Sequence, residues 1–97
     1  MSEPYIDIEK IVCMLNRMNA LTNPNRIAII ELLLKKEIAS VTEIQVQLNL
    51  ERATTSNHLR ILRDNNLVKA KKSGKNKFYS INHIALAEII TSISSCS

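Results

Sequence analysis

The segment Glu51-Arg-Ala-Thr-Thr-Ser-Asn-His-Leu-Arg-Ile-Leu-Arg63 determines the fold that this sequence predicts. Thr55, Leu59 and Leu62 recur at helical spacing and form one inward stripe, while most of the other side chains are polar. The sequence therefore predicts a short helix over about 52–64 that packs on one side and exposes polar side chains on the other.

Two strands are predicted directly after this helix, at Leu67–Lys72 and Lys77–Ile81. The segment between them, Ser73-Gly-Lys-Asn76, contains the only glycine of the chain and is typical of a turn. A polar-faced helix followed by a basic hairpin is suited to placing one element in a DNA groove and bracing it with a second.

The charges concentrate in the same region. Residues 52–77 carry eight of the thirteen lysines and arginines and a single acidic residue. Residues 1–51 hold five basic and seven acidic residues, so the net charge of +4 reflects one strongly basic patch on a slightly acidic body. This distribution is typical of proteins that bind nucleic acids.

Four further helices are predicted, three before this region and one after it. The first covers about 5–20 and has Pro4 near its start. Asn23-Pro24 is an N-cap followed by proline, and it opens the second helix, which ends near Lys35-Lys36. The predicted buried face of the second helix consists of Ile27, Ile30, Leu33 and Leu34.

The third helix is predicted to begin at Ser40-Val-Thr-Glu43, which has the spacing of a capping box, and to end at Asn49. The last helix is predicted over about 82–95. The predicted fold is mainly α with a small β-hairpin. It is a winged helix–turn–helix with additional N- and C-terminal dimerisation helices, formed by residues 1–97 as a single domain.

Length and composition narrow the class of protein. A 97-residue chain with 45% apolar residues predicts one small domain, which gains from burying more surface by dimerisation. Because there is no run of eighteen apolar residues and no N-terminal secretion signal, we expect a cytoplasmic protein that does not enter a membrane. Two cysteines far apart in sequence are too few for a disulfide scaffold.

Four motifs follow one another in a specific order. Leu21-Thr-Asn-Pro-Asn-Arg-Ile-Ala-Ile-Ile-Glu-Leu-Leu33 and Val41-Thr-Glu-Ile44 are followed by Ser56-Asn-His-Leu-Arg-Ile-Leu62 and Asn66-Leu-Val68. Together they resemble the second, third and recognition helices and the wing entry of the ArsR/SmtB family of bacterial winged-helix repressors. The resemblance implies a homodimer, built largely from the first and last helices, that binds an inverted-repeat operator in double-stranded DNA and represses transcription.

In a helix–turn–helix protein, the N-terminal part of the second helix meets the base edges. Arg52 is predicted to bind guanine, Asn57 adenine, and Ala53 or Thr54 a thymine methyl group. Ala53 departs from the polar residue that is common in the family at that position. Phosphate contacts are predicted for Ser56 and Arg60 on the helix and for Lys69, Lys71, Lys72, Lys75 and Lys77 on the wing.

A purely structural interpretation of these residues stays open. The polar face of the helix could be only solvated, and lysines at a hairpin edge can serve only to discourage edge pairing. Three other side chains are predicted to have structural roles. We expect His58 to pack in the helix interface, Thr55 to bond the carbonyl four residues earlier, and Arg26 to brace the second helix.

The apolar stripes of the first and last helices predict the dimer interface. The residues assigned to it are Ile8, Ile11, Val12, Leu15, Leu86, Ile89, Ile90 and Ile93.

Neither metal site of the resembled family transfers to this sequence. Some relatives carry a cysteine pair at the start of the third helix, but Ala39-Ser-Val-Thr-Glu43 has no thiol. Others carry carboxylate–histidine pairs on the last helix, which in this chain offers only His83 and Glu88. No metal or cofactor is therefore expected, and the effector stays unknown.

Cys13 and Cys96 lie on the two helices that pair in the dimer. They are either a redox-sensing pair or a packed thiol and an inert one.

Other classes of protein fit less well. An enzyme is not expected, because there is no glycine-rich phosphate loop, no carboxylate cluster and no histidine near either cysteine in the sequence. RNA binding would require stacking aromatic residues, and the chain has only Tyr5, Phe78 and Tyr79. The main alternative is a winged-helix domain that binds protein, although such domains usually lose the basic wing that this chain keeps.

Overall fold

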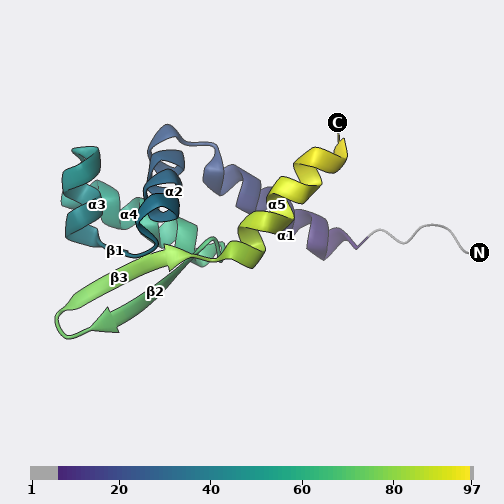
Figure 1. Ribbon diagram of the computed structural model, residues 1–97. Coiled ribbons are helices and arrows are strands. Elements are labelled where there is room, and N and C mark those ends of the chain that lie inside the picture. The colour runs from purple at the N-terminus through teal and green to yellow at the C-terminus, as the bar shows by residue number, and fades with distance from the viewer. Residues whose placement is uncertain (1–6, 97) are drawn as a thin grey trace, which may run out of the picture.

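A computed structural model describes the backbone of residues 7–96 and the side chains of residues 7–91. The elements follow one another as α1 (Ile8–Leu21), α2 (Pro24–Lys36), β1 (Ala39–Ser40), α3 (Val41–Leu48), α4 (Arg52–Asp64), β2 (Val68–Ser73), β3 (Asn76–Ile81) and α5 (His83–Cys96). The described chain is a winged helix–turn–helix with an additional helix at each end, as the sequence predicts (Figure 1).

Side-chain caps set the ends of α2 and α3. The side chain of Asn23 accepts hydrogen bonds from two backbone N–H groups of the first turn of α2, at 2.9 and 3.2 Å, and Pro24 takes the first helical position. Ser40 Oγ accepts from the backbone N–H of Glu43 at 3.1 Å, and the Glu43 carboxylate accepts from the backbone N–H of Ser40 at 3.0 Å. Asn49, with φ of 53°, ends α3. The predicted capping box is thus confirmed.

The start of α1 differs from the prediction. The helix begins at Ile8, because the Asp7 side chain caps it by accepting from the backbone N–H of Lys10 at 3.1 Å, whereas the prediction included Asp7 in the helix. Positions 5 and 6 of the predicted helix lie outside the described residues. Pro4 lies outside the described residues.

The buried face of α2 also differs from the prediction. Ile29, Ile30 and Leu33 are buried, whereas Ile27 and Leu34 are about half exposed. Nearly every position from 27 to 34 is apolar, so the periodicity alone could not select the buried arc.

The sheet has three antiparallel strands in the order β1–β3–β2. β2 and β3 pair from Val68↔Ile81 to Ser73↔Asn76, so the connecting turn has two residues, Gly74 and Lys75. Gly74 has φ of 63°, which suits the first position of a tight hairpin turn. β1 has only two residues and was not predicted; it pairs with β3 through Ala39↔Tyr79 and Ser40↔Phe78.

The hydrophobic core lies between the sheet and helices α2, α3 and α4. Residues of every helix and strand contribute to it, and α1 contributes only Ala20 among the fully buried apolar residues described. α1 and α5 lie together at the end of the molecule opposite the wing tip (Figure 1). The radius of gyration is 15.3 Å, above the roughly 13 Å expected for a compact domain of this length. The terminal helices therefore project from the core.

The predicted dimer residues fall into two groups. On α1, the four residues Ile8, Ile11, Val12 and Leu15 are between 47% and 69% exposed. On α5, Ile90 is exposed, Leu86 is half-buried against the core, and Ile89 is only 2% exposed. Ile89 therefore belongs to the core of its own protomer, which differs from the prediction that it faces a partner. The side chain of Ile93 lies outside those described.

Candidate nucleic-acid interface

α4 divides its side chains between the core and solvent. Thr55, His58, Leu59 and Leu62 are buried. All six side chains predicted to contact DNA from this helix are exposed and lie on the side away from the core. These are Arg52, Ala53, Thr54, Ser56, Asn57 and Arg60. The exposed Arg63 was not among the predicted residues, although its spacing of three from Arg60 places it on the same face.

Hydrogen bonds hold several of the exposed side chains of α4 in place. Arg52 Nη1 donates to Thr42 Oγ1 at 3.3 Å, which links the start of α4 to α3. Arg60 Nη2 donates to Asn57 Oδ1 at 2.8 Å, and Arg60 Nη1 lies 3.4 Å from a carboxylate oxygen of Asp64. Reading of an adenine by Asn57 uses both its oxygen and its nitrogen. Because an amide oxygen can accept two hydrogen bonds, the bond from Arg60 orients Asn57 and leaves one acceptor site and the NH2 group for a base.

Inside the protein, α4 is anchored to α2. Arg26 Nε donates to His58 Nδ1 at 3.2 Å, and Arg26 Nη1 donates to the Ala20 carbonyl at 3.3 Å. Burial, and secondarily the positive charge of Arg26, lowers the pKa of His58 below its usual 6.5. Thr55 Oγ1 donates to the Glu51 carbonyl at 2.8 Å. The structural roles predicted for Arg26, His58 and Thr55 are thus confirmed.

The pairing of β2 with β3 divides the wing lysines between two faces. Val68, Ala70 and Lys72 share one face of β2, and their partners Ile81, Tyr79 and Lys77 share the same face of β3. The apolar members of this face are in the core, so the face turns towards the helices; we call it the inner face.

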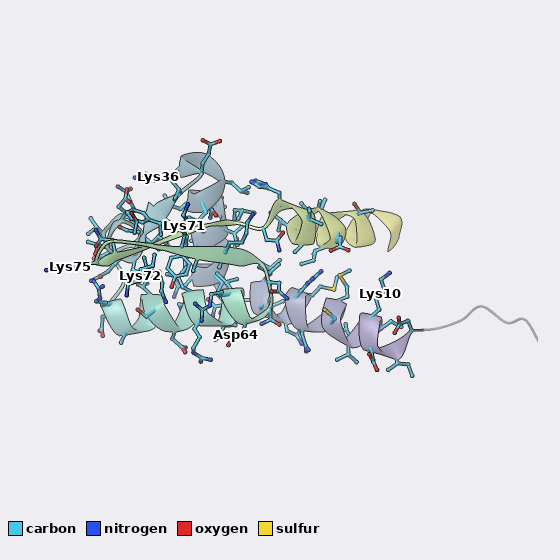
Figure 2. The ribbon with its side chains drawn as sticks, turned by 90° about the horizontal axis from the view of Figure 1, so that it is seen from below. Lys10, Lys36, Asp64, Lys71, Lys72 and Lys75 are labelled. Atoms are coloured by element: carbon cyan, nitrogen blue, oxygen red, sulfur yellow. The ribbon has the colours of Figure 1, made fainter. Side chains whose placement is uncertain are left out.

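Lys69 and Lys71 lie on the other face of the hairpin, opposite Ser80 and Phe78, and we call this the outer face. Lys75 is at the turn. Figure 2 shows the same division, with Lys72 on the α4 side of the hairpin and Lys71 on the opposite side. The five lysines that the sequence placed together are therefore not equivalent.

Lys72 and Lys77 lie directly opposite each other on the inner face. Like charges in this position destabilise a sheet in the absence of a ligand. Both side chains are exposed, and Figure 2 shows Lys72 on the side of α4. The inner face and the exposed side of α4 thus form one positively charged corner, which suits a polyanion.

Tyr79 joins the wing to α4. It is buried on β3, and burial raises the pKa of its phenol, an effect that the positive charge of Arg63 on α4 partly offsets. The core contact of Tyr79 keeps the base of the hairpin fixed against the recognition helix.

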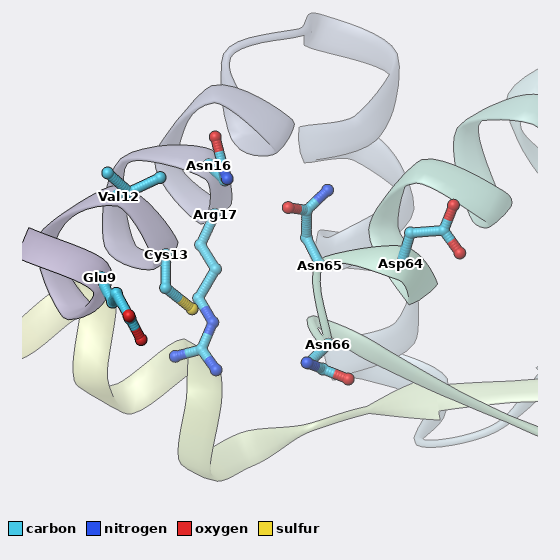
Figure 3. Close-up of a pocket in the computed structure, with 8 residues that line it drawn as sticks. All are labelled: Glu9, Val12, Cys13, Asn16, Arg17, Asp64, Asn65 and Asn66. Carbon is cyan, nitrogen blue, oxygen red and sulfur yellow. The ribbon is translucent and has the colours of Figure 1, made fainter.

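A hollow of about 320 Å³ lies between α1 and the C-terminal end of α4 (Figure 3). Glu9, Val12, Cys13, Asn16, Arg17, Asp64, Asn65 and Asn66 line it. Arg17 Nη1 pairs with a carboxylate oxygen of Glu88 at 3.1 Å and so connects α1 to α5. Cys13 is exposed and carries no disulfide in the described structure. The side chain of Cys96 lies outside those described, so the redox pair stays a prediction.

The described residues contain no group of three or more histidine, cysteine, aspartate or glutamate side chains placed to hold a metal ion. Within the same residues, no helix is long and apolar enough to cross a membrane.

A comparison with protein families identifies the chain. A model described as bacterial regulatory protein, arsR family, matches residues 23–70, which include α2, the helix–turn–helix and the start of the wing. The chain belongs to the ArsR family. Members of this family are DNA-binding transcriptional regulators.

Individual relatives agree with this assignment. The transcriptional repressor SmtB homolog of Synechocystis sp. is 32% identical over 68 residues, which are 68% of this chain and 51% of that protein. The ArsR-family chain thus spans about half the length of this relative. The transcriptional repressor PagR of Bacillus anthracis has a similar structure, with a TM-score of 0.76 and 26% identity over 90% of this chain and 99% of that one.

A third relative shares the fold. It is a homodimeric winged helix–turn–helix DNA-binding domain from Mycobacterium bovis, with a TM-score of 0.76 and 20% identity over 99% of this chain and 90% of that one.

Proposed function

We propose that this ArsR-family chain is a homodimeric repressor that binds an inverted-repeat operator in double-stranded DNA in the cytoplasm. The observation that carries the proposal is the positively charged corner formed by α4 and the inner face of the wing. Like charges directly opposite each other, such as Lys72 and Lys77, cost stability unless a polyanion binds them. In this proposal Arg52, Ala53, Thr54 and Asn57 meet base edges.

Five of the seven remaining candidate residues position the protein on the DNA backbone. Ser56 and Arg60 would contact phosphates beside the major groove. Lys72 and Lys77, with Lys75 at the turn, would reach phosphates or the minor groove next to it. Backbone contacts of this kind supply affinity and register, whereas base contacts supply specificity.

Dimerisation is supported by the apolar surface at the end opposite the wing. Ile8, Ile11, Val12 and Leu15 expose a continuous helical stripe on α1, and Ile90 is exposed on neighbouring α5. Fully burying a side chain of this size contributes about 1.5–3 kcal/mol. A two-fold axis at this end would direct two recognition helices to half-sites of one operator. Occupancy of such an operator would block transcription without any catalysis.

The signal that releases the repressor is proposed to be something other than a metal at the family's usual sites. The start of α3 carries no thiol, and α5 carries His83 and Glu88 without the further ligands that a tetrahedral zinc site requires. Glu88 is also already paired with Arg17.

A footprint on the DNA upstream of the protein's own gene tests this function. We expect two protected half-sites related by a two-fold axis, with centres about 10–10.5 base pairs or a multiple apart. The affinity at physiological salt should be in the range of about 10⁻⁸–10⁻¹¹ M, at least about 10³-fold tighter than for unrelated DNA.

A matched pair of lysine variants controls this measurement. Lys72→Gln should weaken binding to all DNA sequences and reduce the salt slope by roughly one. Lys35→Gln, which removes the same charge from the exposed end of α2, should leave both unchanged. Equal affinity for operator and unrelated DNA would refute the proposal.

A further inference from the structure

The outer face of the wing combines two basic side chains with an apolar surface. Lys69 and Lys71 of β2 lie opposite Ser80 and Phe78 of β3 on this face, and Figure 2 shows Lys71 on the side away from α4. We propose that the outer face is a docking surface for an acidic segment of another protein, one whose apolar side chains alternate with carboxylates.

The apolar part of this surface comes from Ile38 and Phe78. Ile38 lies just before β1 and is 52% exposed. Phe78 is half-buried and is the pairing partner of both Ser40 and Lys71. Ile38, Phe78, Lys71 and Ser73 enclose a hollow of about 290 Å³, large enough for one apolar side chain of a partner. The exposed Ile38 and the partly open ring of Phe78 thus give this face an apolar component beside its lysines.

The charges around the hollow favour an acidic partner. Lys69 and Lys71 are exposed, and no ion pair involves them within the described structure. Lys36 lies on the same side of the hairpin in Figure 2, but its ammonium group is held by Glu43 at 3.2 Å. The exposed Glu37 precedes Ile38 and offsets part of the charge. The two free lysines still leave the outer face positive.

DNA fits this face less well than a peptide does. DNA phosphates would pair with the lysines but would make no favourable contact with Ile38 and Phe78. The outer face also turns away from α4, the helix that would enter the groove. A second copy of the chain fits less well too, because a two-fold contact would place Lys69 and Lys71 against the same lysines. An acidic peptide with an apolar anchor satisfies both parts of the surface.

Two pairs of lysines on the same hairpin allow a matched test in DNA binding. The variant Lys69→Gln/Lys71→Gln alters the outer face, and Lys72→Gln/Lys77→Gln alters the inner face. We expect the inner-face variant to reduce the salt slope of operator binding by about two and the outer-face variant to leave it unchanged. A reduced slope for the outer-face variant would assign Lys69 and Lys71 to DNA and overturn the proposal.

Peptide binding is measured directly and does not depend on the proposed operator. The probe is a fluorescein-labelled synthetic peptide in which Phe and Leu alternate with pairs of Glu, and its polarisation is followed with the full chain. We expect Lys69→Glu/Lys71→Glu and Ile38→Ser each to weaken binding by at least about tenfold. Lys72→Glu/Lys77→Glu should bind as the unchanged chain does, and circular dichroism checks that each variant is folded.

Three results would overturn the docking surface. One is the absence of binding to the unchanged chain, and a second is equal weakening by the inner and outer charge reversals. The third is equal binding of a control peptide in which Ser replaces every Phe and Leu, since this would reduce the interaction to charge alone. If the peptide does not bind but operator binding is normal, the docking surface is refuted and the proposed repressor function stands.

Discussion

Arg26 Nε donates a hydrogen bond to His58 Nδ1 at 3.2 Å and thereby ties the first turn of α2 to the middle of the recognition helix. A ring nitrogen that accepts a hydrogen bond is unprotonated, so His58 is neutral and carries its proton on Nε2. Because Arg26 also reaches the Ala20 carbonyl, one guanidinium group connects the end of α1, the start of α2 and α4. The orientation of α4 thus depends on a neutral histidine.

Mild acid should destabilise the protein through His58. Its pKa in the folded protein is below the usual 6.5, chiefly because of burial, so the unfolded chain binds more protons at pH values between the two. The stabilisation is complete above 6.5 and is lost as the pH falls from 6.5 towards the folded pKa. Urea unfolding at about pH 7.5 and about pH 5.5 measures the loss.

Two variants show whether His58 causes this dependence. His58→Gln should flatten the change in stability over this interval, whereas His83→Gln, at the other and exposed histidine, should keep it. Glu43 does not interfere, since its pKa is lowered from 4.5, chiefly by the backbone hydrogen bond from Ser40, and it titrates at lower pH. A His58→Gln variant with the same pH dependence as the unchanged protein would disprove this role.

Aspartate substitutions on the two terminal helices should have different outcomes. Leu15→Asp places a charge on the exposed stripe of α1 and should give a folded monomer, with operator affinity lowered by about 10²- to 10⁴-fold through lost bivalency. Ile89→Asp buries a charge in the core and should unfold the chain. Sedimentation equilibrium and circular dichroism distinguish the two. A Leu15→Asp chain that remains dimeric would place the interface elsewhere.

The capping box of α3 should contribute measurably to stability. Ser40→Ala removes the acceptor for the backbone N–H of Glu43 and should cost about 1 kcal/mol in urea unfolding. Ser73→Ala, at the exposed end of β2, should stay within about 0.5 kcal/mol of the unchanged protein. Equal stability of the two variants would mean that the cap contributes nothing.

The elements predicted from the sequence were those with strong local signals. Asn23-Pro24, the capping box at Ser40 and the spacing of Thr55, Leu59 and Leu62 each specify a local structure, and all were confirmed. β1 was missed because a two-residue strand has no periodicity of its own and depends on β3 for its pairing. The predicted buried face of α2 was right at Ile30 and Leu33 and wrong at Ile27 and Leu34, because the run of apolar residues carries no contrast between faces.

The sequence predicted which residues make up the candidate site but not how they are arranged in space. Arg26 and His58 are 32 positions apart, so their hydrogen bond follows from tertiary packing alone. The division of the lysines between two faces needs the strand register. The turn at Gly74 and Lys75 sets that register, and the sequence predicted a longer turn. The assignment of Ile89 failed for a similar reason, since both faces of α5 carry apolar residues.

The most direct test of sequence reading by α4 compares the affinities for operator and unrelated DNA at one salt concentration, measured by fluorescence anisotropy. Arg52→Ala should lower the ratio of these affinities by roughly 5- to 150-fold, because a lost base contact costs about 1–3 kcal/mol of discrimination. Thr42→Val removes the partner that Arg52 contacts at 3.3 Å but keeps the arginine, and it should leave the ratio unchanged. An Arg52→Ala protein that loses affinity equally for both DNAs, or for neither, would contradict the claim that this helix reads the bases.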